Sequence, residues 1–113
     1  ENADVARVFI EAGANVNECN ECGSTPLFFC NNAEVARVLI EAGAGVNACN
    51  ECGETPLFYC DNVEVAHVLI EAGADVHARD NQANTAMHST VNEEIHDLLR
   101  QYTQRSVFSV TDN

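Results

Sequence analysis

The cysteines are the residues of this sequence with the clearest capacity for chemistry. Four of them form two Cys-x-x-Cys pairs, Cys19 with Cys22 and, thirty positions later, Cys49 with Cys52. Two thiols at positions i and i+3 of a turn come within about 7 Å, which permits a disulfide or two thiolates on one metal ion. A pair that recurs is also the usual sign of a four-thiolate zinc or iron–sulfur site. Free thiols, a disulfide within each pair and a metal site all stay open.

The remaining polar residues do not predict catalysis. None of the four histidines stands near a nucleophile and an orienting acid in the sequence, and no glycine-rich phosphate loop occurs. His67 lies between Glu64 and Glu71 at helical spacings, which is typical of an exposed charge ladder. We therefore expect neither enzymatic activity nor a cofactor.

Charge and composition restrict the class of partner. The 113 residues include five basic and eighteen acidic side chains, for a net charge of −13. This balance opposes binding to phosphate backbones and to anionic lipid, so we expect a protein partner, preferably basic, and no nucleic acid or membrane. The 46% hydrophobic content suffices for one packed domain, and no segment is long enough to span a bilayer. With no leader visible and thiols that need no oxidation, we expect an intracellular, cytoplasmic location.

A repeat of fixed length organises the chain. The segment Glu41–Leu57 resembles the stretches that begin at Glu11 and at Glu71, thirty positions before and after it. Cysteines follow the same period, since Cys19, Cys22 and Cys30 become Cys49, Cys52 and Cys60. A constant period of this size indicates a stack of supersecondary units.

Three equivalent amphipathic helices are predicted over residues 2–12, 32–42 and 62–72. Apolar residues recur there at i, i+3, i+4 and i+7, the spacing that lines one helix face. Asn2 is in a suitable position for an N-cap and Gly13 for a left-handed stop. The apolar stripes are Val5, Val8, Phe9 and Ala12, then Val35, Val38, Leu39 and Ala42, then Val65, Val68, Leu69 and Ala72.

A hairpin-like finger and a short helix are predicted to connect successive long helices. The polar run after Gly13 ends at Gly23 and contains turn residues with a single apolar anchor, Val16, so it does not read as a strand. Thr25 is then in the position of an N-cap. Pro26 follows at the first helical position, where its missing N–H costs no intrahelical hydrogen bond. Residues 43–56 repeat this pattern, so each unit is a finger, a short helix and a longer helix.

These features resemble the ankyrin repeat. Thr25-Pro26-Leu27 and Thr55-Pro56-Leu57 match the start of its Thr-Pro-Leu-His-x-Ala signature, and residues 43–48 match its helix exit. The resemblance covers residues 2 to about 101 and implies an all-α helical solenoid of about three full repeats and a partial N-terminal one. We divide the chain into a repeat domain, 1–102, with units at about 1–17, 18–47, 48–77 and 78–102, and a C-terminal tail, 103–113.

The sequence departs from the family pattern in length and at two signature positions. The period is 30 residues instead of 33, and the shortfall falls between the two helices, which predicts a trimmed first helix. Phe28 and Phe58 replace the signature histidine, whereas His88 keeps it and is implied to make a hydrogen bond between repeats. Cys30 and Cys60 replace a small buried alanine, so they are predicted to be apolar filler. The resemblance also makes Asn17, Asn47 and His77 hydrogen-bonding struts between fingers.

The two ends of the stack differ. Glu93, His96 and Arg100 replace residues that are apolar in earlier helices, so residues 85–102 are predicted to form a C-terminal cap. At the other end, Val5, Val8 and Phe9 lack one packing partner. We expect the chain to be part of a longer repeat array or a multidomain protein; the alternatives are a self-sufficient ragged end and an end that a second copy covers. Residues 103–113 show no helical period and are expected to be a frayed tail, or a small extension that packs through Val107, Phe108 and Val110.

The resemblance implies a non-catalytic protein–protein interaction module that uses its concave face. Aromatic residues among acids suit a partner with Arg or Lys and apolar side chains, although the same residues could serve only packing and solubility. The alternative function is metal binding or redox sensing through Cys19, Cys22, Cys49 and Cys52, which requires both finger tips to bend together because stacked units lie about 8–10 Å apart. The predicted partner-binding residues are Glu21, Cys22, Ser24, Phe29, Glu51, Cys52, Glu54, Tyr59, Asn81 and Asn84.

Overall fold

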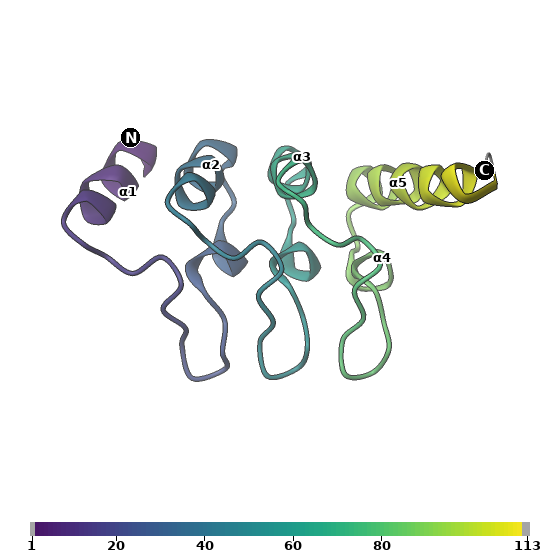
Figure 1. The fold of residues 1–113 in the computed structure, drawn as a ribbon, viewed down its shortest axis with the longest axis horizontal. Coiled ribbons are helices and arrows are strands. Elements are labelled where there is room, and N and C mark those ends of the chain that lie inside the picture. The colour runs from purple at the N-terminus through teal and green to yellow at the C-terminus, as the bar shows by residue number, and fades with distance from the viewer. Residues whose placement is uncertain (1, 112–113) are drawn as a thin grey trace.

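The protein is a row of stacked helical units (Figure 1). The computed structural model describes the backbone of residues 2–111 and the side chains of residues 3–103. No strand occurs in this described part, which confirms the all-helical fold. The long helices are α1 (Asn2–Glu11), α2 (Ala33–Glu41), α3 (Val63–Glu71) and α5 (Glu93–Thr111), and the short ones are η1 (Pro26–Phe29), η2 (Pro56–Tyr59) and α4 (Ala86–Ser89).

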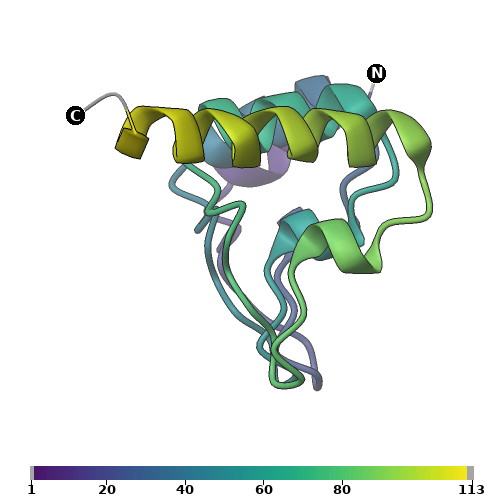
Figure 2. The same cartoon turned by 90° about the vertical axis from the view of Figure 1, so that its right-hand side faces the viewer.

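The elements form two helical rows and a set of projecting loops (Figures 1 and 2). The long helices make one row, the short helices make the second, and the loops between them extend away from the long helices. We call these loops finger 1 (13–25), finger 2 (43–55) and finger 3 (73–85). Gly13, Gly43 and Gly73 begin the fingers with φ values of 100°, 101° and 105°, which confirms the left-handed stop expected after each of the first three long helices.

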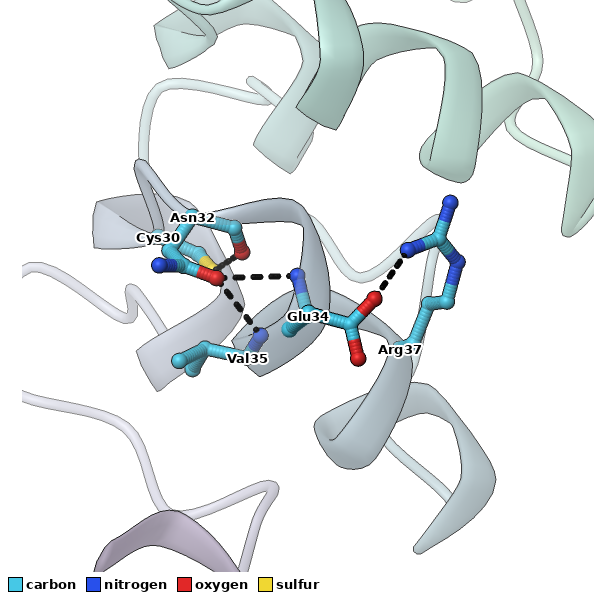
Figure 3. A network of polar contacts seen from close by, with 5 residues as sticks. All are labelled: Cys30, Asn32, Glu34, Val35 and Arg37. Atoms are coloured by element: carbon cyan, nitrogen blue, oxygen red, sulfur yellow. Dashed lines mark hydrogen bonds and ion pairs between the residues drawn. The ribbon is translucent and has the colours of Figure 1, made fainter. Parts of the chain in front are cut away.

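Asparagine side chains cap the second and third long helices. Oδ1 of Asn32 accepts hydrogen bonds from Glu34 N at 2.9 Å and Val35 N at 3.2 Å (Figure 3), and Asn62 makes the same pair to α3. These bonds satisfy backbone donors that a helix leaves unpaired in its first turn. The first helix differs from its prediction, because Asn2 is already its first residue.

The short helices are single turns, as expected for a trimmed unit, but threonine does not cap them through its side chain. In η1 and η2 the turn closes through Phe28 N to Thr25 O and Phe58 N to Thr55 O, each at 3.0 Å. The N–H that a threonine hydroxyl would accept is therefore already bonded to the threonine carbonyl. As a result Oγ1 of Thr25 is buried without a hydrogen-bond partner, which corrects the predicted role of this side chain.

The core lies between the two helical rows. Its most deeply buried large side chains come from both rows, and Ala36 and Ala66 are completely buried, so neighbouring units approach closely. Ala42 and Ala72, which we predicted in the apolar stripes, are exposed because α2 and α3 end one residue before them. The large side chains with less than 2% exposure are Leu27, Leu57, Leu69, Ile95, Leu99, Val65 and Pro56.

The two ends of the stack have opposite character. Val5, Val8 and Phe9 are 52%, 62% and 62% exposed, as expected for residues that lack a packing partner. The outer side of α5 is polar instead, and Arg100 contacts Asp97 Oδ1 at 3.5 Å and His96 Nδ1 at 3.2 Å. This arrangement agrees with the predicted polar cap.

The last helix corrects the prediction for residues 103–113. We expected no helix there, yet α5 continues to Thr111. No glycine follows Arg100 in the way that Gly13, Gly43 and Gly73 follow the earlier helices, so nothing in the sequence stops this one. The predicted packing of Val107, Phe108 and Val110 lies outside the side chains that the structure describes.

Candidate functional site

Asparagine struts hold successive fingers at a fixed separation. Asn17 donates from Nδ2 to the carbonyl of Gly43 at 3.0 Å and accepts the N–H of Gly45 at 2.8 Å. Asn47 makes the equivalent bonds to Gly73 and Asp75, at 3.1 and 2.8 Å. The strut role implied by the family resemblance is confirmed for both asparagines, and it fixes the base of each finger.

The finger tips are joined by backbone hydrogen bonds. Glu51 N donates to the carbonyl of Cys22 at 2.9 Å, and Asn81 N donates to that of Cys52 at 2.8 Å. Gly53 fits this contact because it has φ +78° and because a Cβ there would lie 2.6 Å from Oδ1 of Asn81. The tips therefore form a continuous ridge that carries several predicted partner-binding residues.

The two Cys-x-x-Cys pairs are not placed across closed turns. The turns close through Gly23 N to Asn20 O and Gly53 N to Asn50 O, both at 3.0 Å. Cys19 and Cys49 therefore precede the turns, whereas Cys22 and Cys52 lie inside them, which corrects the geometry assumed from the sequence. All six cysteines are free in the structure.

The alternative metal function gains no support from the side-chain arrangement. Within the described residues, no three His, Cys, Asp or Glu side chains come together in a way that could hold a metal ion. Cys19, Cys22, Cys49 and Cys52 are all exposed, and the thiol of Cys49 donates to the carbonyl of Asn47 at 3.7 Å. Both predicted alternatives for these thiols, a disulfide and a metal, are thus unsupported by this geometry.

Cys30 and Cys60 are packing residues, as predicted. Cys30 is half-buried and its thiol donates to the carbonyl of Asn32 at 3.2 Å (Figure 3). Cys60 is buried and its thiol donates to the carbonyl of Asn62 at the same distance. Burial raises the pKa of both thiols above the ordinary value for cysteine. Both thiols are consequently harder to ionise, and less reactive, than an exposed cysteine.

Tyr59 belongs to a polar network that joins the first two fingers. Its hydroxyl donates to Oε1 of Glu54 at 2.7 Å. Nδ2 of Asn50 contacts the same oxygen at 3.1 Å, the Tyr59 hydroxyl at 3.3 Å and Oγ of Ser24 at 3.4 Å. The hydrogen bond to Glu54 raises the pKa of Tyr59 above its ordinary value.

This network shows which functional residues the sequence reasoning missed. Asn50 was not singled out, although Asn20, Asn50 and Asp80 recur at the same position of each unit. In all three units Oδ1 of this residue accepts two backbone N–H groups of the finger turn, at 2.9 to 3.0 Å. The periodic recurrence of a short polar side chain before the glycine turn was the available signal.

Most of the predicted partner-binding residues are accessible, with one exception. Phe29 is 63% and Tyr59 46% exposed, and the rings of Tyr59 and Phe28 meet in a T-shaped contact, with centroids 5.6 Å apart. Ser24 is only 5% exposed, so we leave it out of the candidate surface. Glu54 and Asn84 are half-buried, and the other exposed members are Glu21, Cys22, Glu51, Cys52 and Asn81.

The acids of the first two fingers take part in no ion pair with a described side chain. The ion pairs found among the described side chains join Arg7 to Asp4, Arg37 to Glu34 and Arg100 to Asp97, all within long helices. Fingers 1 and 2 contain no Lys or Arg, and finger 3 contains Arg79 and His77. Fingers 1 and 2 therefore carry only negative formal charge.

The histidine of the third unit does not have its expected role. His88 is exposed, and within the described part of the chain its ring makes no hydrogen bond between repeats. The equivalent residues Phe28 and Phe58 are buried in the core.

A family model described as ankyrin repeats, with three copies, matches residues 1–80. No curated protein matches the sequence. None of the described helices has the length and apolar character needed to cross a membrane. Ankyrin repeats are in general non-catalytic protein–protein interaction modules. Because the family model matches 80 of the 113 residues and the structure consists of stacked finger–helix–helix units, this chain belongs to the ankyrin repeat family.

Proposed function

We propose that this chain binds another protein along the side formed by its finger tips and short helices, and that the partner presents basic and apolar side chains together. We call this side the finger surface; in the ankyrin family it corresponds to the concave face. Nucleic acid and anionic membranes are poor partners for a chain of net charge −13. The residues of the finger surface are Glu21, Cys22, Phe29, Glu51, Cys52, Glu54, Tyr59, Asn81 and Asn84.

The observation that carries the proposal is an exposed aromatic ring held beside a carboxylate without a basic partner. Tyr59 is 46% exposed and its hydroxyl is fixed by Glu54 at 2.7 Å. A ring that is already ordered loses little conformational entropy when a partner covers it. Exposed aromatics are the most common binding hot spots, and the surrounding carboxylates favour Arg or Lys at the partner's contact.

The proposal is tested by neutralising the finger acids without a change of shape. A variant with Glu21→Gln, Glu51→Gln and Glu54→Gln is used as bait beside the unmodified chain, and the captured proteins are identified by mass spectrometry. The control variant carries Glu41→Gln, Glu64→Gln and Glu71→Gln, which remove the same charge from exposed positions on α2 and α3. A specific partner should bind the unmodified chain and the control, and it should be lost with the finger variant and with Tyr59→Ala.

Salt dependence provides the second criterion. Binding through the finger acids should weaken as ionic strength rises, because exposed charges are screened beyond about 8 Å at physiological salt. Equal loss of the partner with both triple variants would mean that net charge alone attracts it, and the finger surface would then not be the binding site.

A further inference from the structure

Arg79 is the only lysine or arginine on the three fingers, and its side chain is exposed. The acids of its own finger bind backbone groups, since Asp75 accepts the N–H of His77 and Asp80 accepts that of Gln82, both at 2.9 Å. Within the described residues Arg79 takes part in no ion pair, whereas the other arginines with described side chains each contact an acid; these are Arg7, Arg37 and Arg100. A cationic group is thus left available on the fingers of a strongly acidic chain.

This arginine lies where finger 2 meets finger 3. The two backbones run antiparallel there, because their contacts pair Cys52 with Asn81, through a hydrogen bond of 2.8 Å, and Gly53 with Asp80. One step further along the same register, Arg79 comes to the level of Glu54. No ion pair joins these two side chains, and Oε1 of Glu54 accepts the hydroxyl of Tyr59 instead.

The repeat also indicates which side of the finger Arg79 occupies. Cys19 has the equivalent position in finger 1, where it lines a cavity together with Ser24 and Phe29. That cavity lies between the finger and its short helix. Position 79 therefore belongs to the same side as Tyr59, so Arg79 extends the finger surface onto the third unit, although the sequence reasoning did not select it.

The charge of the finger surface changes along the stack. Fingers 1 and 2 carry four acids and no Lys or Arg; the acids are Glu18, Glu21, Glu51 and Glu54. The equivalent positions of the third unit hold the neutral residues Ala78, Asn81 and Asn84. Arg79 replaces the neutral Cys19 and Cys49, so the tip of finger 3 presents a cation where the first two fingers present carboxylates.

We propose that Arg79 binds a carboxylate of the partner, an inference that rests on the finger surface being the binding site. The partner is an extended segment with basic side chains opposite fingers 1 and 2 and an acidic side chain opposite finger 3. Successive units lie about 8–10 Å apart, and an extended chain rises about 3.3 Å per residue, so one unit corresponds to about three residues. The pattern recognised is basic-x-x-basic-x-x-acidic, in either chain direction.

Arg79 gives the finger surface a way to discriminate between basic partners. A chain of net charge −13 attracts any cationic segment at long range. A segment that is basic throughout brings a like charge against Arg79, whereas an acidic side chain there meets a guanidinium whose planar donors match a carboxylate. Specificity for the mixed segment thus comes from repulsion of the wrong charge as well as from attraction of the right one.

The experiment uses two synthetic peptides with blocked ends, Lys-Leu-Ala-Lys-Leu-Ala-Glu and Lys-Leu-Ala-Lys-Leu-Ala-Gln, and measures their affinities for the full chain by fluorescence anisotropy. Long-range attraction favours the Gln peptide, which is the more cationic of the two. The Glu peptide should nevertheless bind about threefold more tightly, the size expected for one exposed ion pair. Such a preference requires a local cationic contact.

Substitution of the arginine should reverse this order. Arg79→Gln should make the Gln peptide the tighter ligand and leave the melting temperature unchanged, because Arg79 is exposed. The matched control is Arg37→Gln, which removes the same charge from an exposed position on α2 and should preserve the preference for Glu. Tighter or equal binding of the Gln peptide to the unmodified chain, a Glu preference that survives Arg79→Gln, or no binding of either peptide up to about 1 mM would overturn the proposal.

The variant with Glu21→Gln, Glu51→Gln and Glu54→Gln separates this proposal from the one on which it rests. It should weaken both peptides, whose lysines face those acids. If it does so while Arg79→Gln has no effect, the finger surface stands and the role of Arg79 is wrong. If both peptides bind the triple variant as well as they bind the unmodified chain, the finger acids are not the contact and the proposed function fails.

Discussion

The side chain of Asn47 reaches Asp75 in the next unit, where its Oδ1 accepts the backbone N–H at 2.8 Å while its Nδ2 donates to Gly73 O at 3.1 Å. One side chain thus satisfies both a donor and an acceptor at the point where α3 ends and finger 3 begins. We expect Asn47→Ala to lower the free energy of unfolding by about 1–2 kcal/mol, since each net hydrogen bond contributes roughly 0.5–1.5 kcal/mol. Urea denaturation measures the loss, and Glu41→Gln is the control, with a change within about 0.5 kcal/mol.

The same position of successive helices should respond very differently to truncation. Leu69 is 1% exposed, and Leu69→Ala should cost about 2–5 kcal/mol through lost burial and a residual cavity. Phe9 occupies the equivalent place in α1 but is 62% exposed, so Phe9→Ala should cost less than about 1 kcal/mol. Thermal melts of both variants would test this, and similar losses would mean that Phe9 is covered in solution.

Removal of the orphaned hydroxyl of Thr25 should stabilise the protein. Oγ1 is buried without a partner, and a buried unsatisfied polar group costs about 1–3 kcal/mol. Thr25→Val keeps the shape of the side chain and removes that cost, so the midpoint of denaturation should rise. Thr103→Val is the contrasting variant, because the Thr103 hydroxyl donates to Leu99 O at 2.9 Å and its loss should be destabilising.

The six thiols should divide into two classes of reactivity. Cys19, Cys22, Cys49 and Cys52 are exposed and should react rapidly with a disulfide reagent at pH 8, whereas Cys30 and Cys60 should react only after denaturation. The raised pKa values of Cys30 and Cys60 also make the stability of the fold depend on pH. The preference for the buried neutral thiol is fully present below the ordinary cysteine pKa and is lost as the pH rises through the higher folded-state value.

Substitution of an exposed finger cysteine separates free thiols from bound ones. Cys22→Ser should remove one fast-reacting thiol and change the free energy of unfolding by no more than about 0.5 kcal/mol. A larger loss, or thiols that become reactive only with a chelator, would restore the metal or disulfide alternatives for the finger cysteines.

The ionisation of Tyr59 should report directly on its contact with Glu54. The hydrogen bond keeps the phenol protonated and raises its pKa, so the contact is complete below the ordinary tyrosine pKa and is lost as the pH rises through the raised value. Glu54→Ala should move this pKa back towards its ordinary value. The tyrosinate absorbance, taken as the difference from Tyr59→Phe to remove the signal of Tyr102, measures the shift.

The repeating part of the fold could be predicted because local signals and packing agree there. Gly43 and Gly73 stop α2 and α3, Asn32 and Asn62 cap them, and the apolar spacing selects the buried face. The last helix is longer than predicted because the sequence holds no signal that ends it. Beyond Arg100 the apolar period fades, but a helix continues until something ends it, and no glycine or proline occurs there.

The candidate site was less predictable, because exposure depends on contacts between units. Ser24 and Glu54 occupy equivalent positions, yet Ser24 is buried and accepts a bond from Asn50, whereas Glu54 is half-buried and holds Tyr59. The cysteine spacing was likewise read as a turn from i to i+3, while the backbone closes its turn one residue later. The sequence of a single repeat indicates neither the different exposure of Ser24 and Glu54 nor the position at which the turn closes.

Each finger is fastened to the next at two distant points, the tip, where Glu51 N meets Cys22 O, and the base, where Asn17 meets Gly43 and Gly45. Two attachments on one arm remove the freedom to pivot that a single attachment would leave. A torque applied to one tip is therefore passed to the neighbouring unit instead of being absorbed by bending of the loop. The row of fingers should therefore behave as one stiff body. Its curvature is set by helix packing and changes for all the fingers together.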